Sequence, residues 1–388
     1  MRPSKAELGD LSLACERLWQ LDDNRAEPGS DYQINLQAAK KGFNPADVAP
    51  QPLFSWVSPE LLRQRRTYAL FFSLLDNYHR DTGVAERATP QQKREVSDFL
   101  DAVLISTPMQ YVHACLSAKR LVAPEPRAFK DQLFQMWFQP YTRESRDDTS
   151  GFEHVFVGEV DKGRVSGFHN WIAFQAEEAA GRLNYLGHLP PRGRGRGASE
   201  YEDTGPGERL VSVQFAWGPE VKDVSSIWIG TSPEFEMALY TLCFGAGREE
   251  NDVMVGDYLV KIRAYHIHSK YGDKVGSCFP ELLAKVPGRA SSAQAWAPAT
   301  PQQPPWQSAQ QPAWQPPGAP WAPQQQPLPP PPIWQQPGGH PGWQQPGGQP
   351  GVQQAGGGGQ GQPGCGNVVQ MVLDALVGYL KKRFGGGK

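Results

Sequence analysis

The sequence predicts an α+β protein, because the spacing of its hydrophobic residues changes along the chain. In residues 1–135, apolar side chains recur every three or four positions, which is typical of helices. In residues 136–286, short segments with alternating apolar residues stand between helical ones. Residues 287–364 consist mainly of Pro, Gln, Gly and Ala. We therefore expect a mainly helical N-terminal part, then a part that contains a β-sheet, and a disordered C-terminal tail.

Four helices are predicted in the N-terminal part. Thr89 can cap a helix and precedes Pro90, and this pair is typical of a helix start. The apolar residues that mark the four helices are Leu11, Cys15, Leu18 and Trp19; the run 67–75; Phe99, Leu100, Val103 and Leu104; and Phe129, Leu133, Trp137 and Phe138. The simplest interpretation of these stripes is that they pack in the core.

The second part begins with a predicted hairpin. Val155 and Val157 alternate as in a strand, residues 161–163 form a turn, and residues 165–169 return. The remaining predicted elements are a helix that Asn170 caps and that runs toward Arg182, a strand over 211–215, a helix that begins at Ser232 and continues through Leu239, and a strand from Tyr258 to His268.

Composition excludes several classes of protein. The 388 residues carry a net charge of −2, with a pI near 6.5, so the average charge is not that of a protein that coats nucleic acid. The five cysteines are widely spaced without a CxxC motif, so neither a disulfide framework nor a zinc site is predicted. Neither a signal peptide nor an apolar span of about eighteen residues is evident. We expect an intracellular monomer, cytoplasmic or nuclear, with free thiols.

The C-terminal region divides into a linker, residues 287–364, and a short terminal segment, residues 365–388. The linker repeats the motif Trp-Gln-Gln-Pro-Gly at 334–338 and 343–347. The terminal segment is predicted to form an amphipathic helix. Its apolar face and basic end consist of Val368, Val369, Val372, Leu376, Val377 and Leu380, followed by Lys381, Lys382 and Arg383. Docking onto a protein partner and lying on an anionic membrane surface are both open for this helix.

Two histidines and a lysine are the candidate catalytic residues. His154 and His169 lie fifteen positions apart, joined by the predicted hairpin, and Lys222 follows. A single histidine is more often a surface or core residue, but two that a hairpin could bring together fit acid–base catalysis. Two imidazoles and an ammonium group can cleave RNA without a protein nucleophile. One imidazole removes the 2′-hydroxyl proton, the other protonates the leaving 5′-oxygen, and the cation stabilises the phosphate.

The expected products are a 2′,3′-cyclic phosphate and a 5′-hydroxyl. We assign His169 as general base and His154 as general acid. The predicted helix that begins beside His169 supports this order, because its positive end keeps the imidazole neutral. The main-chain amides at this helix start, including that of Gly167, could bind a phosphate oxygen. Lys222 would stabilise the phosphorane, and the alternative interpretation of Lys222 is an exposed loop lysine.

Several segments around these residues resemble the EndoU family, the XendoU-type poly(U)-specific endoribonucleases. They are SGFEHVFVGE (150–159), GFHNWI (167–172), FAWGPEVK (215–222) and GTSPEFEMALYTLCF (230–244), with DNRAEPGSDYQINLQ (23–37) and FFSLLDNYHRDTGV (71–84) in the helical part. The resemblance covers nearly all of residues 1–286 and none of the tail. It implies an EndoU catalytic part within residues 136–286, which cleaves single-stranded RNA at uridines. It also implies catalytic roles for His154, His169 and Lys222.

The resemblance further implies dependence on Mn²⁺. Glu153 and Glu159 flank the first histidine and are the candidate ligands, since carboxylates suit a hard cation. The alternative is that they are ordinary strand carboxylates and that Mn²⁺ orders the RNA or the protein. No cluster of three ligands is visible in the sequence.

Uridine selection requires groups that stack on an unpaired base and hydrogen-bond to it. The resemblance implies that Tyr265, on the last predicted strand, binds the substrate together with Ser225 and Ser226. Relatives often have Thr-Tyr-Thr where this chain has Ala-Tyr-His at 264–266. The resemblance therefore supports RNA cleavage more strongly than it supports a preference for uridine.

Two motifs and one rival hypothesis remain. His266 and His268 are interpreted as surface residues rather than metal ligands. The run RGRGRG at 192–197 either contacts RNA phosphates or is a flexible insertion loop, and we favour the loop. The rival to an enzyme is a catalytically weak RNA-binding or scaffolding protein that acts through its low-complexity tail. The intact set of two histidines and a lysine favours the enzyme.

Overall fold

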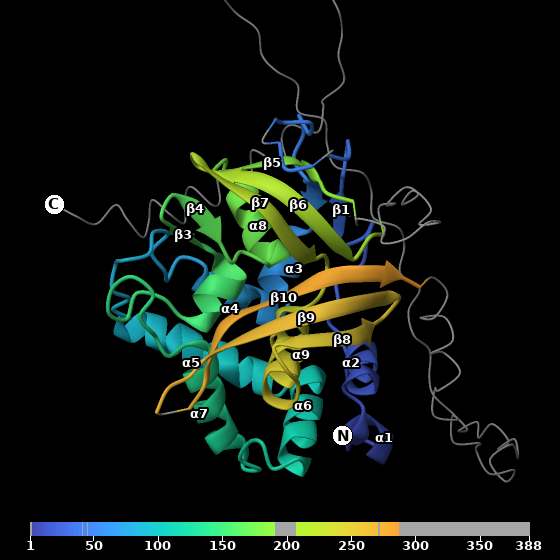
Figure 1. Ribbon diagram of the computed structural model, residues 1–388, viewed down its shortest axis with the longest axis vertical. Coiled ribbons are helices and arrows are strands. Elements are labelled where there is room, and N and C mark those ends of the chain that lie inside the picture. The colour runs from blue at the N-terminus through green and yellow to red at the C-terminus, as the bar shows by residue number, and fades with distance from the viewer. Residues whose placement is uncertain (1, 41, 45, 191–206, 271, 287–388) are drawn as a thin grey trace, which may run out of the picture. The chain divides into compact units, whose positions relative to one another are not determined.

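The computed structural model describes residues 2–40, 42–44, 46–190, 207–270 and 272–286 (Figure 1). The run at 192–197, the linker and the terminal segment lie outside these residues, so what is predicted for them stays a prediction. Helices and antiparallel strands occur together in the described part of the chain, as the predicted α+β class requires. None of the helices described there has the length and apolar character needed to cross a membrane.

The N-terminal part is mainly helical, as predicted. Its helices are α1 (Lys5–Gly9), α2 (Leu11–Gln20), α3 (Pro59–Gln64), α4 (Arg66–Leu74), α5 (Pro90–Leu104), α6 (Thr107–Ala118) and α7 (Pro126–Trp137). The four predicted helices are confirmed as α2, α4, α5 and α7. Thr89 caps α5 as expected, because its hydroxyl accepts a hydrogen bond from the amide of Gln92. α6 has no predicted counterpart, since it is buried on most sides and lacks a clear polar face.

A small antiparallel pair, β1 (Tyr32–Ile34) and β2 (Phe54–Val57), interrupts the helices. Two three-stranded antiparallel sheets belong to the second part, with the orders β5–β6–β7 and β10–β9–β8. Their strands are β5 (Leu183–His188), β6 (Leu210–Trp217), β7 (Glu220–Trp228), β8 (Glu250–Val255), β9 (Tyr258–Ile267) and β10 (Lys274–Lys285). The strands predicted over 211–215 and 258–268 are confirmed as β6 and β9.

The predicted hairpin between the two histidines is only partly correct. Residues 161–163 do turn, between β3 (Glu159–Asp161) and β4 (Arg164–Ser166). The strand predicted at Val155 and Val157 is wrong, because Glu153–Val157 form a π-helix, labelled η1. The alternation misleads because the first four residues of this segment are all buried, so the segment has no exposed face. Gly158, with φ of +88°, then ends the π-helix.

Two helices begin at predicted capping residues. α8 (Trp171–Ala179) follows Asn170, and α9 (Pro233–Ala246) follows Ser232. The Asn170 side chain accepts hydrogen bonds from two amides of the first turn, and the Ser232 hydroxyl accepts one. α8 ends before the predicted Arg182, because Gly181 adopts φ of +69° just after it.

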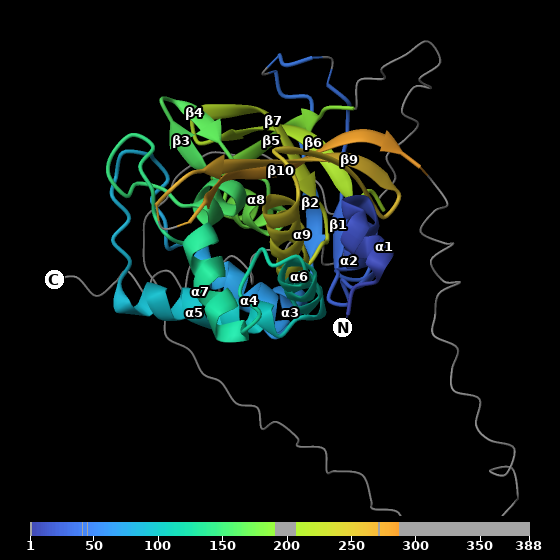
Figure 2. The ribbon, with the colours of Figure 1, turned by 60° about the horizontal axis from the view of Figure 1, so that its bottom comes forward.

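Helix α9 lies at the centre of the fold. Residues 233–244 are all buried. α9 packs against α2, α4 and α6 and also against β9 and β10, and Figure 2 shows it beneath these strands. Strand β10 packs in turn against β7 and η1. Because of this packing, the π-helix with His154 lies close to the strand with Lys222.

Candidate active site

The two predicted catalytic histidines are joined by main-chain hydrogen bonds. The amide of Phe168 donates to the carbonyl of His154 (3.0 Å), and the amide of His169 donates to the carbonyl of Val155 (2.8 Å). Gly167 makes this approach possible, since a Cβ atom there would lie 1.7 Å from the carbonyl oxygen of His154. Its φ of +63° also favours glycine. The structure therefore brings the histidines together, although through a π-helix, an element frequent at functional sites.

A carboxylate holds the imidazole of His154. Nδ1 of His154 lies 2.7 Å from Oε1 of Glu159, and Nε2 lies 3.2 Å from Oγ of Ser277. Arg143 forms an ion pair with the same Oε1 (2.9 Å), and the hydroxyl of Thr149 donates to Oε2 (2.7 Å). Because an ionised carboxylate only accepts hydrogen bonds, Nδ1 of His154 carries a proton and donates it.

This contact shifts the pKa values of both partners. Burial lowers the pKa of His154, and the hydrogen bond to Glu159 acts in the opposite direction by stabilising the imidazolium. Burial by itself raises the pKa of Glu159, but the hydrogen bond and charge of His154, together with Arg143, outweigh burial and lower it. Glu159 therefore stays ionised at neutral pH and keeps a negative charge beside His154.

Neutral groups hold the imidazole of His169. Its Nδ1 lies 3.1 Å from the carbonyl oxygen of Ser226 and 3.1 Å from Oγ of Ser225. The hydroxyl of Ser225 donates to the carbonyl of Phe168 (2.6 Å), so Nδ1 of His169 is the donor to Ser226. The ring stacks on Phe279, with centroids 4.7 Å apart and planes 11° apart. Nε2 of His169 is therefore the nitrogen with the lone pair.

Lys222 completes the group and repels both histidines. It lies in β7 and is half-buried, so the alternative of an exposed loop lysine is wrong. Burial lowers the pKa of Lys222 to about 8, although the charges of Asp223 and Glu159 act in the opposite direction. Burial, followed by repulsion from Lys222 and from His154, lowers the pKa of His169 well below its ordinary value. The charge of Lys222 lowers the pKa of both histidines, so its ammonium group lies within electrostatic range of the two imidazoles.

The three predicted uridine-binding side chains differ in exposure. Ser225 is fully buried, and its hydroxyl bonds to the main chain before α8. Ser226 is 8% exposed, and its Oγ lies 3.1 Å from Oγ of Ser212. Tyr265 is 36% exposed, and its hydroxyl accepts a hydrogen bond from Arg263 (3.0 Å). Tyr265 is thus the most accessible of the three.

Ser277 and Phe279, both on β10, are absent from the predicted site residues although they contact the two histidines directly. In the β9–β10 register, Ser277 lies opposite Tyr265 and Phe279 lies opposite Arg263, so the four side chains share one face. Alternation along residues 274–285 is the signal that could have indicated this face. A register shift just before Ser277 breaks that period.

The contacts of Glu153 and Glu159 do not fit a metal site. Both oxygens of Glu159 already accept hydrogen bonds, and Arg143 beside them would repel a metal ion. Glu153 accepts a hydrogen bond from the amide of Ser150 (3.2 Å). Burial, followed by the charge of Glu86, raises the pKa of Glu153 far above its ordinary value, so its carboxyl group is protonated at neutral pH. Among the residues that the structure describes, no three His, Cys, Asp or Glu side chains are grouped to hold a metal ion.

His266 and His268 both approach Asp273. Nδ1 of His268 lies 3.0 Å from the carboxylate and Nδ1 of His266 lies 3.4 Å from it. The side chain of His268 is 82% exposed, whereas His266 stacks on Phe244 with ring centroids 3.9 Å apart. The surface location predicted for both therefore applies fully to His268 alone.

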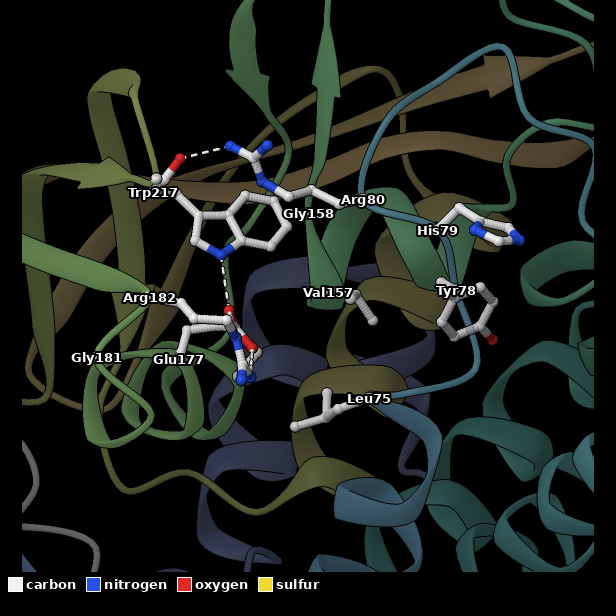
Figure 3. A pocket seen from close by; sticks show the side chains of 12 residues that line it. Leu75, Tyr78, His79, Arg80, Val157, Gly158, Glu177, Gly181, Arg182 and Trp217 are labelled. Atoms are coloured by element: carbon white, nitrogen blue, oxygen red, sulfur yellow. Dashed lines mark hydrogen bonds and ion pairs between the residues drawn. The ribbon is translucent and has the colours of Figure 1, made fainter. Parts of the chain in front are cut away.

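The wall of a pocket of about 460 Å³ includes Val157, the last residue of the π-helix that carries His154, but none of the three catalytic candidates (Figure 3). Arg80, Arg182 and Trp217 are part of its wall. Arg80 donates to the carbonyl of Trp217 (2.5 Å) and pairs with Glu220. As Figure 3 shows, Glu177 accepts from Arg182 (2.5 Å) and from the indole of Trp217 (2.7 Å). These charged side chains are paired with groups of the protein. They therefore stabilise the turn before β7 and are not free to bind a substrate.

Comparison with known proteins gives consistent matches. The family model described as Endoribonuclease XendoU matches residues 10–280. Poly(U)-specific endoribonuclease-A of Xenopus laevis is 39% identical over 287 residues, which cover 71% of this chain and 94% of that protein. Uridylate-specific endoribonuclease C of Danio rerio is also 39% identical over 287 residues, covering 71% of this chain and 89% of that protein.

A solved structure agrees with the sequence matches. It is described as "The structure of XendoU: a splicing independent snoRNA processing endoribonuclease" and shares 39% sequence identity with this chain. The TM-score is 0.61, and the match covers 71% of this chain and 98% of the other. The resemblance seen in the sequence is thereby confirmed, and the chain belongs to the XendoU endoribonuclease family.

Proposed function

We propose that the protein is an endoribonuclease that cleaves single-stranded RNA at uridines, with the RNA's own 2′-hydroxyl as nucleophile. One observation carries the proposal: two buried imidazoles and a lysine lie together, and each ring has its Nδ1 fixed by a different kind of partner. This leaves Nε2 of each ring for proton transfer. The substrate follows from relatives that are named poly(U)-specific and uridylate-specific endoribonucleases.

His169 acts as the general base. Its Nδ1 donates to the carbonyl of Ser226, so Nε2 carries the lone pair. Because burial and the nearby cations hold the pKa of His169 well below its ordinary value, the ring is neutral at pH 7 and can take the 2′-hydroxyl proton. The 2′-oxygen then attacks the adjacent phosphorus, and the bond from phosphorus to the 5′-oxygen of the next nucleotide breaks.

His154 acts as the general acid. The contact with Glu159 stabilises its imidazolium form, so His154 is the more easily protonated of the two rings. The proton passes from Nε2 of His154 to the leaving 5′-oxygen. Ser277, whose hydroxyl lies 3.2 Å from Nε2, is in place to orient that transfer.

Lys222 stabilises the negative charge that develops on the phosphate. Burial lowers the pKa of Lys222 to about 8, so the side chain is still mainly an ammonium ion at pH 7. A partly desolvated cation interacts more strongly with the phosphorane oxygens than a cation in water does. The amide of Gly167, beside His154, is proposed as a second donor to the same oxygens.

The side chains on the shared face of β9 and β10 indicate in which direction the RNA strand would lie across the site. Phe279 stacks on the general base, so it lies on the side of the uridine whose 2′-hydroxyl reacts. Ser277 contacts the general acid, so it lies on the side of the leaving nucleotide, and Tyr265 is opposite Ser277. We therefore assign Phe279 and Ser226 to the uridine and Tyr265 to the nucleotide that follows. This differs from the uridine contact that the resemblance to the family implies for Tyr265.

An end-labelled oligoribonucleotide with a single uridine tests the proposed function. The full-length protein should cut only after the uridine and leave a 2′,3′-cyclic phosphate, and His169→Ala should slow the cut about 10²- to 10⁴-fold. Parallel reactions with Mn²⁺ and with EDTA test the metal dependence that membership of the family implies. RNA binding without cleavage in both reactions would contradict the proposal and favour the RNA-binding hypothesis.

A further inference from the structure

A buried carboxyl group lies behind the segment that carries His169. Glu236, in the first turn of α9, is fully buried. Its Oε1 accepts hydrogen bonds from the hydroxyl of Thr231 (2.7 Å) and from the side-chain amide of Asn170 (3.3 Å). Its Oε2 has no hydrogen-bond partner in the described part of the chain. The mechanism above gives this buried acid no role.

Asn170 connects Glu236 to the general base. It directly follows His169 and is itself fully buried. Its Oδ1 accepts hydrogen bonds from the amides of Ile172 (2.9 Å) and Ala173 (3.1 Å). Its Nδ2 donates to Glu236, so the side-chain amide has one favourable orientation. In the reversed orientation, its oxygen would face Oε1 and its NH₂ group would face two main-chain N–H groups.

The protonation state of Glu236 suits this position. Burial raises the pKa of Glu236 to about 8, although its two hydrogen bonds act in the opposite direction. The titratable groups that act on it or feel its charge are Asp22, Tyr68 and Tyr240. A mainly neutral carboxyl group accepts a hydrogen bond without placing a full negative charge near His169. An ionised one would favour the imidazolium form of His169 and weaken it as a base.

The same segment is also held from other directions. On one side, Ser226 accepts the Nδ1 hydrogen of His169. On the other, the indole of Trp171 donates to the carbonyl of Thr231 (2.8 Å). The backbone around His169 is therefore fixed between β7 and the start of α9. The Ser225 hydroxyl bonds to Phe168 on one side of His169, and Glu236 bonds to Asn170 on the other.

We propose that Glu236 is a positioning residue for the general base. Through Asn170 it holds the His169 ring in the orientation at which Nε2 accepts the 2′-hydroxyl proton. Glu236 touches neither the substrate nor the reacting atoms. The kinetic test of this inference rests on the proposed function, and a second test does not.

Glu236→Leu, made in the full-length protein, removes the acceptor for Asn170. We expect kcat on the single-uridine oligonucleotide to fall about tenfold or more, because a buried amide loses its partner, while KM stays unchanged. Glu236→Gln keeps a neutral oxygen at the position of Oε1 and should restore kcat to near the wild-type value. Thr231→Val is the matched control, since it removes the other hydrogen bond to the same oxygen without touching Asn170. Its kcat should equal that of the wild type.

Asn170→Ser tests the same link without an apolar residue beneath α9. Serine keeps the capping oxygen but does not reach Glu236, so we expect the loss seen with Glu236→Leu, and no further loss in the double variant. In the His169→Ala background, Glu236→Leu should not lower the residual activity further. An additional loss there, or a Glu236→Gln variant as slow as Glu236→Leu, would overturn the proposal. Thermal unfolding of each variant shows whether a loss comes from the fold instead, which would overturn it too.

The ring nitrogens of the histidines give a readout that needs no activity. In ¹⁵N-labelled full-length protein, Glu236→Leu should shift or broaden the Nδ1 and Nε2 signals of His169 and leave those of His154 in place. Unchanged His169 signals would sink the proposal. If the wild type does not cleave RNA while the His169 signals still respond to Glu236→Leu, the proposed function fails and the positioning contact stands.

Discussion

His154 and His169 are the same type of residue in one buried site, yet the Nδ1 atoms of their rings contact different partners. His154 donates to an ionised carboxylate that Arg143 supports. His169 donates to a backbone carbonyl and stacks on an aromatic ring. The charged partner stabilises the imidazolium form of His154, whereas the Ser226 carbonyl raises the pKa of His169 too little to offset burial and the nearby cations. The comparison teaches that the group behind each ring, rather than the ring itself, assigns the acid and the base.

Alanine at either histidine should have the largest effect and should also separate the two roles. On RNA we expect kcat to fall about 10²- to 10⁴-fold for each variant, since each removes one proton transfer. A uridine 3′-phosphodiester with 4-nitrophenol as leaving group needs no proton from a general acid. On that substrate His154→Ala should recover most of the wild-type rate, whereas His169→Ala should stay slow. The opposite pattern would exchange the acid and the base.

Glu159→Gln should have the next largest effect, because it removes the charge that distinguishes the two histidines. Burial lowers the pKa of His154 and the contact with Glu159 limits that decrease, so loss of the contact lowers the pKa further. His154 acts as an acid only when protonated, so activity is present below its pKa and is lost as the pH rises through it. The alkaline limb of the pH–rate profile should therefore move to lower pH, and kcat at pH 7 should fall about 10- to 100-fold.

Thr149→Val is the matched control for this profile. It removes a neutral hydrogen bond to Glu159 and leaves the carboxylate charge in place. Its alkaline limb should move much less than that of Glu159→Gln. Limbs in the same place for Glu159→Gln and the wild type would show that the carboxylate does not set the pKa of His154.

Short sequence signals sufficed for the parts of the site that fold locally. Asn170 caps α8 where its position before an apolar run predicts a cap, and main-chain hydrogen bonds join the two neighbouring histidine segments. The π-helix at 153–157 depends on hydrogen bonds from Phe168 and His169 and on the space that Gly167 leaves, so the alternation of two valines could not indicate it. The periodicity of hydrophobic residues reports on one segment, whereas contacts between two segments determine the backbone conformation here.

Contacts between distant segments account for the rest of what the sequence did not predict. Ser277 meets His154 across 123 positions of the chain, because β10 packs against η1. The contacts of the two predicted metal ligands could not be predicted for a similar reason. The sequence shows that Glu153 and Glu159 flank a histidine, but not that Glu86 and Arg143 become their neighbours in the fold. The pattern of residues within a strand does not indicate which side chains from distant segments become its neighbours.

Substitutions of two aromatic side chains on the shared face of β9 and β10 should have the smallest effects on activity. They also test the direction in which the RNA lies along β10. Phe279→Leu should lower kcat/KM about tenfold on every uridine substrate, because it removes a stacking surface beside the general base. Tyr265→Leu should lower kcat/KM about fivefold on a dinucleotide such as UpA, through the base that follows the uridine. It should leave the 4-nitrophenyl ester unaffected, because that ester has no following base. Equal losses of Tyr265→Leu on both substrates would place Tyr265 with the uridine, as the resemblance to the family implies, and would reverse the direction of the RNA along β10.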